Sequence, residues 1–166
     1  EAARDREVPV DIRLTPSPPK RLRPGVGYGT DTGARISLNY RDVNLWHKGH
    51  ELQGEFSLAQ RRQAAVGKYI LPDRRTVSSY TSLDLGLLRE DVDTYLTRSV
   101  FTGLERVRDF GGGRKGSLYL RLLYERYTIG SEDNTSFVVL PGARYSRRRF
   151  SGSEVRPAKG YRFDLE

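Results

Sequence analysis

Hydrophobic and polar residues alternate with a period of two along most of this chain. In the segment 50–58 the positions on one side are Leu52, Gly54, Phe56 and Leu58. The positions between them are Glu51, Gln53, Glu55 and Ser57. Because a β-strand places successive side chains on opposite faces, this alternation predicts a strand with one apolar and one polar face. The pattern recurs without any long helical segment, so the sequence predicts an all-β, antiparallel up-and-down meander.

Turn residues divide the alternation into about nine expected strands. The expected strands cover about 22–30, 34–41, 50–60, a segment ending near 71, 79–90, 95–107, 118–125, 137–145 and a last strand from 161 onward. We expect a longer turn over 42–49, around Trp46, and a polar loop over 130–135.

Two features favour a transmembrane β-barrel over a soluble sheet. The expected strands approach the roughly 9–11 residues that cross a bilayer when tilted, whereas soluble strands average nearer five or six. The polar face carries mid-strand charges, which suit an aqueous barrel interior: Arg35, Glu55, Asp84 and Arg121. Aromatic residues near strand ends suit the headgroup level: Tyr40, Tyr69, Tyr124 and Tyr145. The alternative is a soluble antiparallel sheet with one solvated face.

Proline-rich sequence separates a short N-terminal strand pattern from the hairpins. Residues 8–14 alternate like a strand, and Pro16, Pro18 and Pro19 lie in the connector that follows. Several prolines in succession exclude a central strand or a helix, so we expect a domain boundary here. The absence of an initiating Met leads us to expect a piece of a longer protein. We interpret the last two residues, 165–166, as a cloning scar.

Composition narrows the range of functions. The absence of Cys excludes a disulfide scaffold, a thiolate metal site and a Cys nucleophile. The net charge of +8 is compatible with nucleic acid or an anionic membrane surface. Nucleic-acid binding normally concentrates charge in one patch with stacking aromatics, but here Arg recurs through strands and turns. The one dense run is 147–149, which we interpret as solvated turn charge, and we expect no nucleic-acid partner.

Several short motifs resemble catalytic or ion-binding sequences, but each lacks a required part. Val26-Gly27-Tyr28-Gly29 matches a potassium-channel filter without its pore helix. The run 111–117 has the phosphate-loop order scrambled. His47 and His50 lack a third metal ligand. No nucleophile accompanies the mid-strand carboxylates, which are Glu51, Glu55 and Asp84. We therefore expect no cofactor, no metal and no enzymatic activity.

The order of these segments resembles the TamA-like members of the BamA/TamA bacterial surface-antigen superfamily of outer-membrane barrels. The similarity begins in the segment 22–33, which resembles a first barrel strand and its loop. It continues in four later segments, which are 46–52, 68–72, 141–147 and 160–164. Residues 8–14 with their proline-rich exit resemble the last strand of a periplasmic POTRA domain.

The resemblance implies a domain division and a mechanism without chemistry. Residues 1–20 would end a POTRA domain, with the N-terminal end in the periplasm. Residues 21–164 would form the first half of a barrel of about sixteen strands in the bacterial outer membrane. In this superfamily a poorly paired first strand opens sideways, and the substrate adds a strand to its edge. The implied seam strand is 22–30, with the substrate-binding residues Gly25, Gly27, Tyr28 and Gly29.

The implied partners are membrane lipids and other polypeptides. They comprise outer-membrane lipid or lipopolysaccharide, unfolded outer-membrane or autotransporter polypeptides, and a periplasm-spanning protein that binds the POTRA domains. Two other functions stay open. One is a passive porin-like or structural outer-membrane barrel, and the other is a soluble all-β module that binds anionic ligands.

Overall fold

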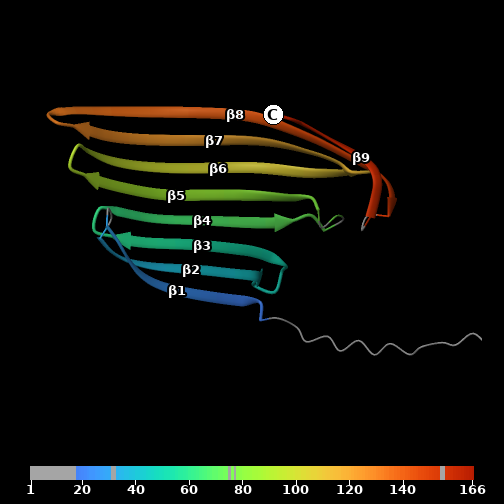
Figure 1. The fold of residues 1–166 in the computed structure, drawn as a ribbon, viewed down its shortest axis with the longest axis horizontal. Helices are drawn as coiled ribbons and strands as arrows, with labels where there is room; N and C mark the ends of the chain where they lie inside the picture. Colours follow the sequence, from blue (N-terminus) through green and yellow to red (C-terminus); the bar gives the residue numbers. More distant parts are fainter. Residues whose placement is uncertain (1–17, 31–32, 75, 77, 154–155) are drawn as a thin grey trace, which may run out of the picture.

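The computed structural model describes residues 18–30, 33–74, 76, 78–153 and 156–166 as a single antiparallel sheet (Figure 1). Its nine strands pair in chain order, so every connection joins neighbours. The strands are Lys20–Gly29 (β1), Gly33–Leu45 (β2), His50–Ala59 (β3), Arg62–Pro72 (β4), Tyr80–Val92 (β5), Tyr95–Gly111 (β6), Arg114–Ile129 (β7), Glu132–Ser153 (β8) and Arg156–Leu165 (β9). The predicted all-β meander is confirmed, and this part of the chain contains no helix.

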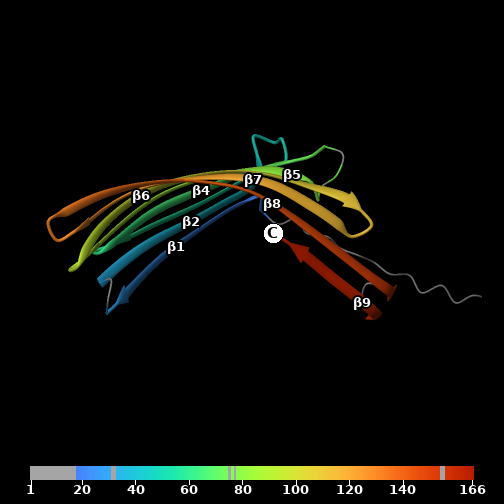
Figure 2. The same ribbon diagram turned by 90° about the horizontal axis from the view of Figure 1, so that it is seen from above.

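The sheet forms one curved layer, with no second layer packed on it among the described strands (Figure 2). Strands β1 and β9 are the two margins, and each pairs with one neighbour. A sheet that is open in this way leaves unpaired backbone groups along both margins.

Cross-strand register sorts the side chains into two faces that run across the whole sheet. Val26 lies opposite Ile36, and Ile36 lies opposite Leu58. Further along, Leu83 lies opposite Leu104, and Leu104 lies opposite Leu120. The residues between these positions form the other face, which carries the predicted mid-strand charges Arg35, Glu55, Asp84 and Arg121. The four tyrosines expected near strand ends belong to the apolar face.

The apolar face is not buried. Phe56 is 42% exposed, Leu85 55% and Leu120 42%, although each lies within a strand. Within the described residues, Ala59 is the one hydrophobic side chain that is buried. A soluble sheet would cover such a face with a second layer, because burial of apolar area is the main favourable term in folding. This sheet must obtain that burial from something other than its own described residues.

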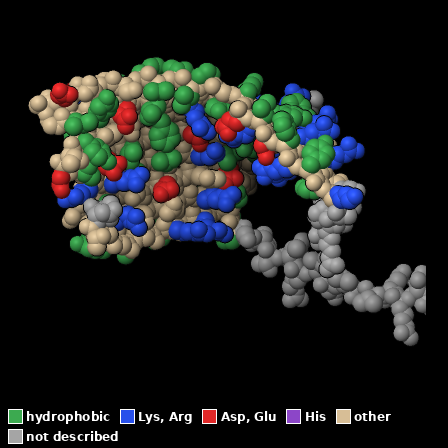
Figure 3. All heavy atoms as spheres, turned by 45° about the horizontal axis from the view of Figure 1, so that its top comes forward, with side chains coloured by type: hydrophobic (Ala, Val, Ile, Leu, Met, Phe, Trp, Pro, Cys, Tyr) green, Lys and Arg blue, Asp and Glu red, His purple; other side chains and the backbone are tan. Residues whose placement is uncertain are grey.

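The polar face is the more crowded of the two. Three of its serines are almost fully buried, at Ser82, Ser99 and Ser117. Lys, Arg, Asp and Glu side chains lie side by side over the hollow of the curved sheet (Figure 3). Curvature toward the polar side crowds these side chains and spreads the apolar ones apart, which is the arrangement of a barrel wall with an aqueous interior.

Several strands extend further than the sequence predicted. The expected turn over 42–49 is wrong, because β2 continues to Leu45 and a four-residue turn, 46–49, follows. A register irregularity lies between Asp42 and Leu45. The buried Asp42 carboxylate accepts hydrogen bonds from the Tyr40 hydroxyl and the Asn44 amide, so polar residues here extend the strand.

The expected polar loop over 130–135 is also wrong. Strand β8 begins at Glu132, directly after the turn at 130–131. Asp133 accepts hydrogen bonds from Arg126 and Thr128 of β7, which explains why a polar segment pairs as a strand. Strand β6 likewise continues to Gly111, and β7 already begins at Arg114.

Glycine is required at the turn between β6 and β7. Gly113 has a φ of 73°, and a Cβ there would lie 2.0 Å from the carbonyl oxygen of Arg148. The Arg148 amide donates a hydrogen bond to the Gly113 carbonyl oxygen at 2.8 Å. Residues 112–113 therefore form the turn of a hairpin, and the rest of the run 111–117 belongs to β6 and β7.

The described residues begin near the predicted domain boundary. The N-terminal strand pattern at 8–14 and most of the proline-rich connector lie outside them, and Lys20 already belongs to β1. At the other end, Leu165 pairs with Tyr145, and the Glu166 carboxylate accepts hydrogen bonds from Arg144 and Tyr119.

In water, the chain on its own should not remain a well-behaved monomer. Its apolar face and two strand margins should cause self-association, pairing of margins, or closure into a smaller non-native barrel. Light scattering and binding of an apolar dye measure this. A monodisperse monomer with little dye binding in the absence of detergent would contradict it.

Candidate functional site

The exposed margin of the sheet at β1 is the candidate site. No second strand pairs with β1 anywhere in the described parts of the chain, so its outer backbone groups face away from the sheet. Its apolar side chains are among the most exposed, with Val26 at 87% and Tyr28 at 80%. An open margin of this kind is a template for an added strand.

The four predicted seam residues all lie in the second half of β1. Gly25 lies opposite Ser37 and Gly27 opposite Arg35, so both belong to the polar face. Tyr28 lies opposite Ala34 on the apolar face, and Gly29 pairs with Gly33 next to the turn. The structure thus places these residues together on one margin but divides them between the two faces.

Neither Gly25 nor Gly27 is required by backbone conformation. Both lie outside the positive-φ region, where glycine would be favoured. A Cβ on Gly27 would meet only the Arg35 guanidinium at 3.9 Å, whereas a Cβ on Gly25 would lie 2.6 Å from the Ser37 hydroxyl. Glycine within a strand weakens pairing, because it has no side chain to pack and loses more backbone entropy. At Gly27, neither backbone conformation nor lack of space requires glycine. The physical effect of glycine that remains there is weaker strand pairing.

Pro24 adds to this weakness. It lies in β1 opposite Leu38 and has no backbone N–H to donate to a ladder. Prolines within sheets are confined mainly to edge strands, strand starts and bulges. The residue is therefore compatible with a strand at a margin.

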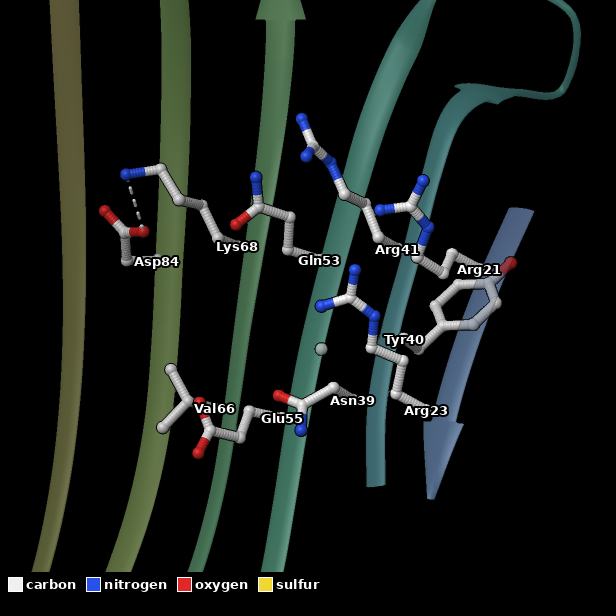
Figure 4. A pocket seen from close by; sticks show the side chains of 11 residues that line it. Arg21, Arg23, Asn39, Tyr40, Arg41, Gln53, Glu55, Val66, Lys68 and Asp84 are labelled. Atoms are coloured by element: carbon white, nitrogen blue, oxygen red, sulfur yellow. Dashed lines mark ion pairs between the residues drawn. The ribbon is translucent and has the colours of Figure 1, made fainter. Parts of the chain in front are cut away.

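A hollow on the polar face adjoins the β1 margin (Figure 4). It has a volume of about 360 Å³ and is lined by residues from β1 to β5. The guanidinium groups of Arg21, Arg23 and Arg41 lie together on one side, while Lys68 and Asp84 lie on the other (Figure 4). Glu55 is the second carboxylate in the lining, so the hollow is basic overall.

The basic character is greatest next to β1. Lys68 pairs with Asp84 at 3.4 Å, and Arg41 pairs with Glu51 at 2.7 Å. Arg21 and Arg23 of β1 form no ion pair with any other residue that the structure describes. Two arginines on an open margin can attract a carboxylate to that margin, although the attraction weakens as salt increases.

The other residues considered from the sequence do not form a chemical site. His50 shares a short hydrogen bond with the Tyr69 hydroxyl, and His47 lies in the turn that follows β2. No three His, Asp or Glu residues in the described ranges lie close enough to hold a metal ion. The interpretation of 147–149 as turn charge is wrong, because Arg147, Arg148 and Arg149 lie within β8. Being consecutive in a strand, they alternate between faces and do not form one patch.

An aromatic group marks the end of the sheet at which β1 begins. Trp46 contacts Tyr69 edge-on, with ring centroids 6.3 Å apart, and Tyr69 also contacts His50. Trp46 and His47 both have positive φ angles, of 55° and 59°. Asn44 stabilises this turn by accepting a hydrogen bond from the Gly49 amide. An exposed Trp that contacts a half-buried Tyr beside an apolar face is typical of a membrane–water interface.

Sequence reasoning identified the β1 margin but missed the basic hollow. Arg21 and Arg23 show the period of two that places them on one face. Their proximity to Arg41 and Lys68 depends on cross-strand register, which the order of residues does not reveal.

Comparison with known proteins supports the type of fold and does not identify a family. No family model matches this chain. The sheet is similar to a solved structure described as "The crystal structure of BamA from Haemophilus ducreyi lacking POTRA domains 1-3", with a TM-score of 0.60 and 11% sequence identity over 82% of this chain. The chain spans 31% of the length of that BamA chain. This likeness confirms the predicted barrel-type meander, while the TamA-like assignment and the POTRA segment stay predictions.

Replacing Gly27 should strengthen the margin. We expect Gly27→Val to stabilise the β1–β2 pairing by about 1 kcal/mol, because valine favours strands and has room at this position. Gly25→Val should gain less, since the Ser37 hydroxyl must first move. Amide hydrogen exchange of β1 measures the effect. Equal protection in both variants and the parent protein would contradict it.

Proposed function

We propose that this chain is part of a bacterial outer-membrane β-barrel that assists the insertion or secretion of other β-rich polypeptides. The observation that carries the proposal is the β1 margin, which is exposed, weakened by glycine and proline, and part of a one-layer sheet with an uncovered apolar face. The apolar face would contact acyl chains, and the polar face would line an aqueous interior. The N-terminal end of β1 would lie in the periplasm.

The dimensions of the apolar face support a membrane location. On β6 the apolar positions lie between Arg98 and Arg106. At roughly 3.3 Å per residue, the step between these two arginines is about 26 Å along the strand, of the same order as the roughly 25 Å apolar band of outer-membrane barrels. The likeness to BamA supports the same location.

The proposed mechanism is strand addition without chemistry. An incoming polypeptide strand would pair with the outer backbone groups of β1, as in β-augmentation. The substrates would be unfolded outer-membrane or autotransporter polypeptides, and Gly25, Gly27, Tyr28 and Gly29 would form the pairing segment. Arg21 and Arg23 would attract acidic groups of the substrate to this margin. A periplasm-spanning partner would bind N-terminal to the barrel.

A passive, porin-like barrel is the second candidate, favoured by the charged hollow of the polar face. The two functions differ in what contacts β1. In an assembly factor a substrate strand pairs there, whereas in a passive barrel the last strand of the same chain stays paired.

Cysteine cross-linking tests strand addition, because the natural chain contains no cysteine. We expect Val26→Cys to form a disulfide with a cysteine in the terminal strand of a substrate arrested during assembly. The matched control is Ile36→Cys, which lies opposite Val26 in β2 and is flanked by strands on both sides. Non-reducing electrophoresis measures the cross-link. Equal yields at both positions, or none at Val26, would support the passive barrel.

A charge on the apolar face should be far more costly than one on the polar face. We expect Leu85→Lys to destabilise the protein folded in lipid vesicles by about 2–4 kcal/mol, the cost of a charge facing the bilayer centre. Val66→Lys is the control, since Val66 lies on the polar face opposite Gly86 at nearly the same level. Denaturant titration of the vesicle-bound protein gives both values. If the two substitutions had equal effects, the membrane orientation would be wrong.

A further inference from the structure

Three arginines from adjacent strands form a row on the apolar face. Arg89 of β5 lies directly opposite Arg98 of β6, and Arg98 lies directly opposite Arg126 of β7. The row is flanked by apolar residues on the same face, since the next positions inward are Leu87, Val100 and Tyr124. The three arginines lie toward the end of the sheet opposite the Trp46 turn.

This row is electrostatically unfavourable unless an anion compensates it. Like charges directly opposite each other on one face of a sheet are destabilising. Two carboxylates relieve part of the repulsion, because Asp91 pairs with Arg89 at 3.0 Å and Asp133 pairs with Arg126 at 2.8 Å. Arg98, in the centre of the row, has no ion pair with any residue in the described part of the chain. The positive charge of Arg98 is therefore not compensated by a described carboxylate.

One donor in the row also lacks a partner. The Nε atom of Arg89 is shielded from solvent and forms no hydrogen bond within the structure. A buried donor left without an acceptor is costly, so such atoms need an explanation. An oxygen-rich anion bound between Arg89 and Arg98 would satisfy this donor together with the unpaired charge.

An apolar groove adjoins the row. It has a volume of about 560 Å³ and is lined on its apolar side by Phe56, Leu58, Ala65, Leu87 and Val100, with the three arginines at its rim. A cationic rim beside an apolar groove matches an amphiphile whose acidic headgroup is attached to acyl chains. A free anion would leave the groove uncovered.

We propose that the row Arg89–Arg98–Arg126 and the adjoining groove bind a membrane lipid that carries phosphate in its headgroup. The guanidinium groups donate hydrogen bonds to the phosphate oxygens, and one or more acyl chains occupy the groove. The site rests on the proposed membrane location, because an acyl chain reaches the groove from the bilayer. It fixes the depth of this part of the sheet, since the arginines lie at the headgroup level.

The test uses the complete barrel of which this chain is proposed to be a part, folded in phosphatidylcholine vesicles, with a fluorescent phosphatidic acid as the probe. We expect Arg98→Gln to weaken phosphatidic acid binding about fivefold, the equivalent of about 1 kcal/mol per basic residue at an anionic membrane surface. Replacing all three arginines with Gln should weaken it by at least about tenfold. Asp133→Asn should strengthen binding, because it releases Arg126 from its ion pair.

The control variant is Arg121→Gln, in β7 but on the opposite face, which should leave the dissociation constant unchanged. Excess inorganic phosphate should compete poorly, because it cannot fill the groove. The site is refuted if Arg98→Gln and the triple variant bind the probe like Arg121→Gln, or if inorganic phosphate displaces the probe at similar concentrations. If the complete barrel does not fold into phosphatidylcholine vesicles at all, the membrane location itself fails, and that failure is seen before any probe is added.

Discussion

An apolar face without a covering layer is the constraint on which the rest of this structure depends. A soluble sheet of this size would bury its leucines and phenylalanines against a second layer, but here the side chains in mid-strand are about half exposed. Between its two open margins, the backbone of the sheet satisfies its own hydrogen bonds from strand to strand, as a structure in a bilayer must. In the proposed membrane location, lipid would supply the apolar contacts that the protein interior lacks, which is compatible with a sheet whose polar face lines the hollow.

The same constraint determines the energetic cost of the open β1 margin. In a bilayer an unpaired strand is costly, because no water satisfies its backbone groups. Pro24 and Gly27 weaken this margin. A purely structural barrel would therefore be more stable without them. Space and backbone conformation do not require glycine at residue 27, and the weaker pairing that glycine gives is consistent with the proposed exchange of partners at β1. Arg21 and Arg23 on the same strand form no ion pair with another described residue, which is consistent with a surface that receives another chain.

The alternation of residue types predicted the faces of the sheet because a period of two depends on local geometry alone. Leu52, Phe56 and Leu58 were therefore assigned correctly to one face without any knowledge of strand pairing. Strand ends were predicted less well, because the polar residues at 42–45 and 132–135 resemble loops. In the structure Asp42 and Asp133 accept hydrogen bonds that extend the ladders. The basic hollow and the arginine row could not be predicted, since both depend on register, which the turns and the irregularities near Asp42 and Asp109 determine.

Charges on the two faces of this sheet have different physical consequences. Those on the polar face, such as Asp84 and Lys68, can stay solvated in an aqueous interior and need no fixed depth. Those on the apolar face are tolerated only where the hydrocarbon ends, because the cost of a charge falls steeply toward the interface. In the proposed membrane location, Arg98 at one end and Arg106 at the other, which pairs with Asp73 at 2.8 Å, would mark the boundaries of the hydrocarbon layer. Strands β6 to β8 extend past these two arginines, so in the proposed location their turns would lie in water or among headgroups, which suits the largely polar residues at 109–115 and 130–133.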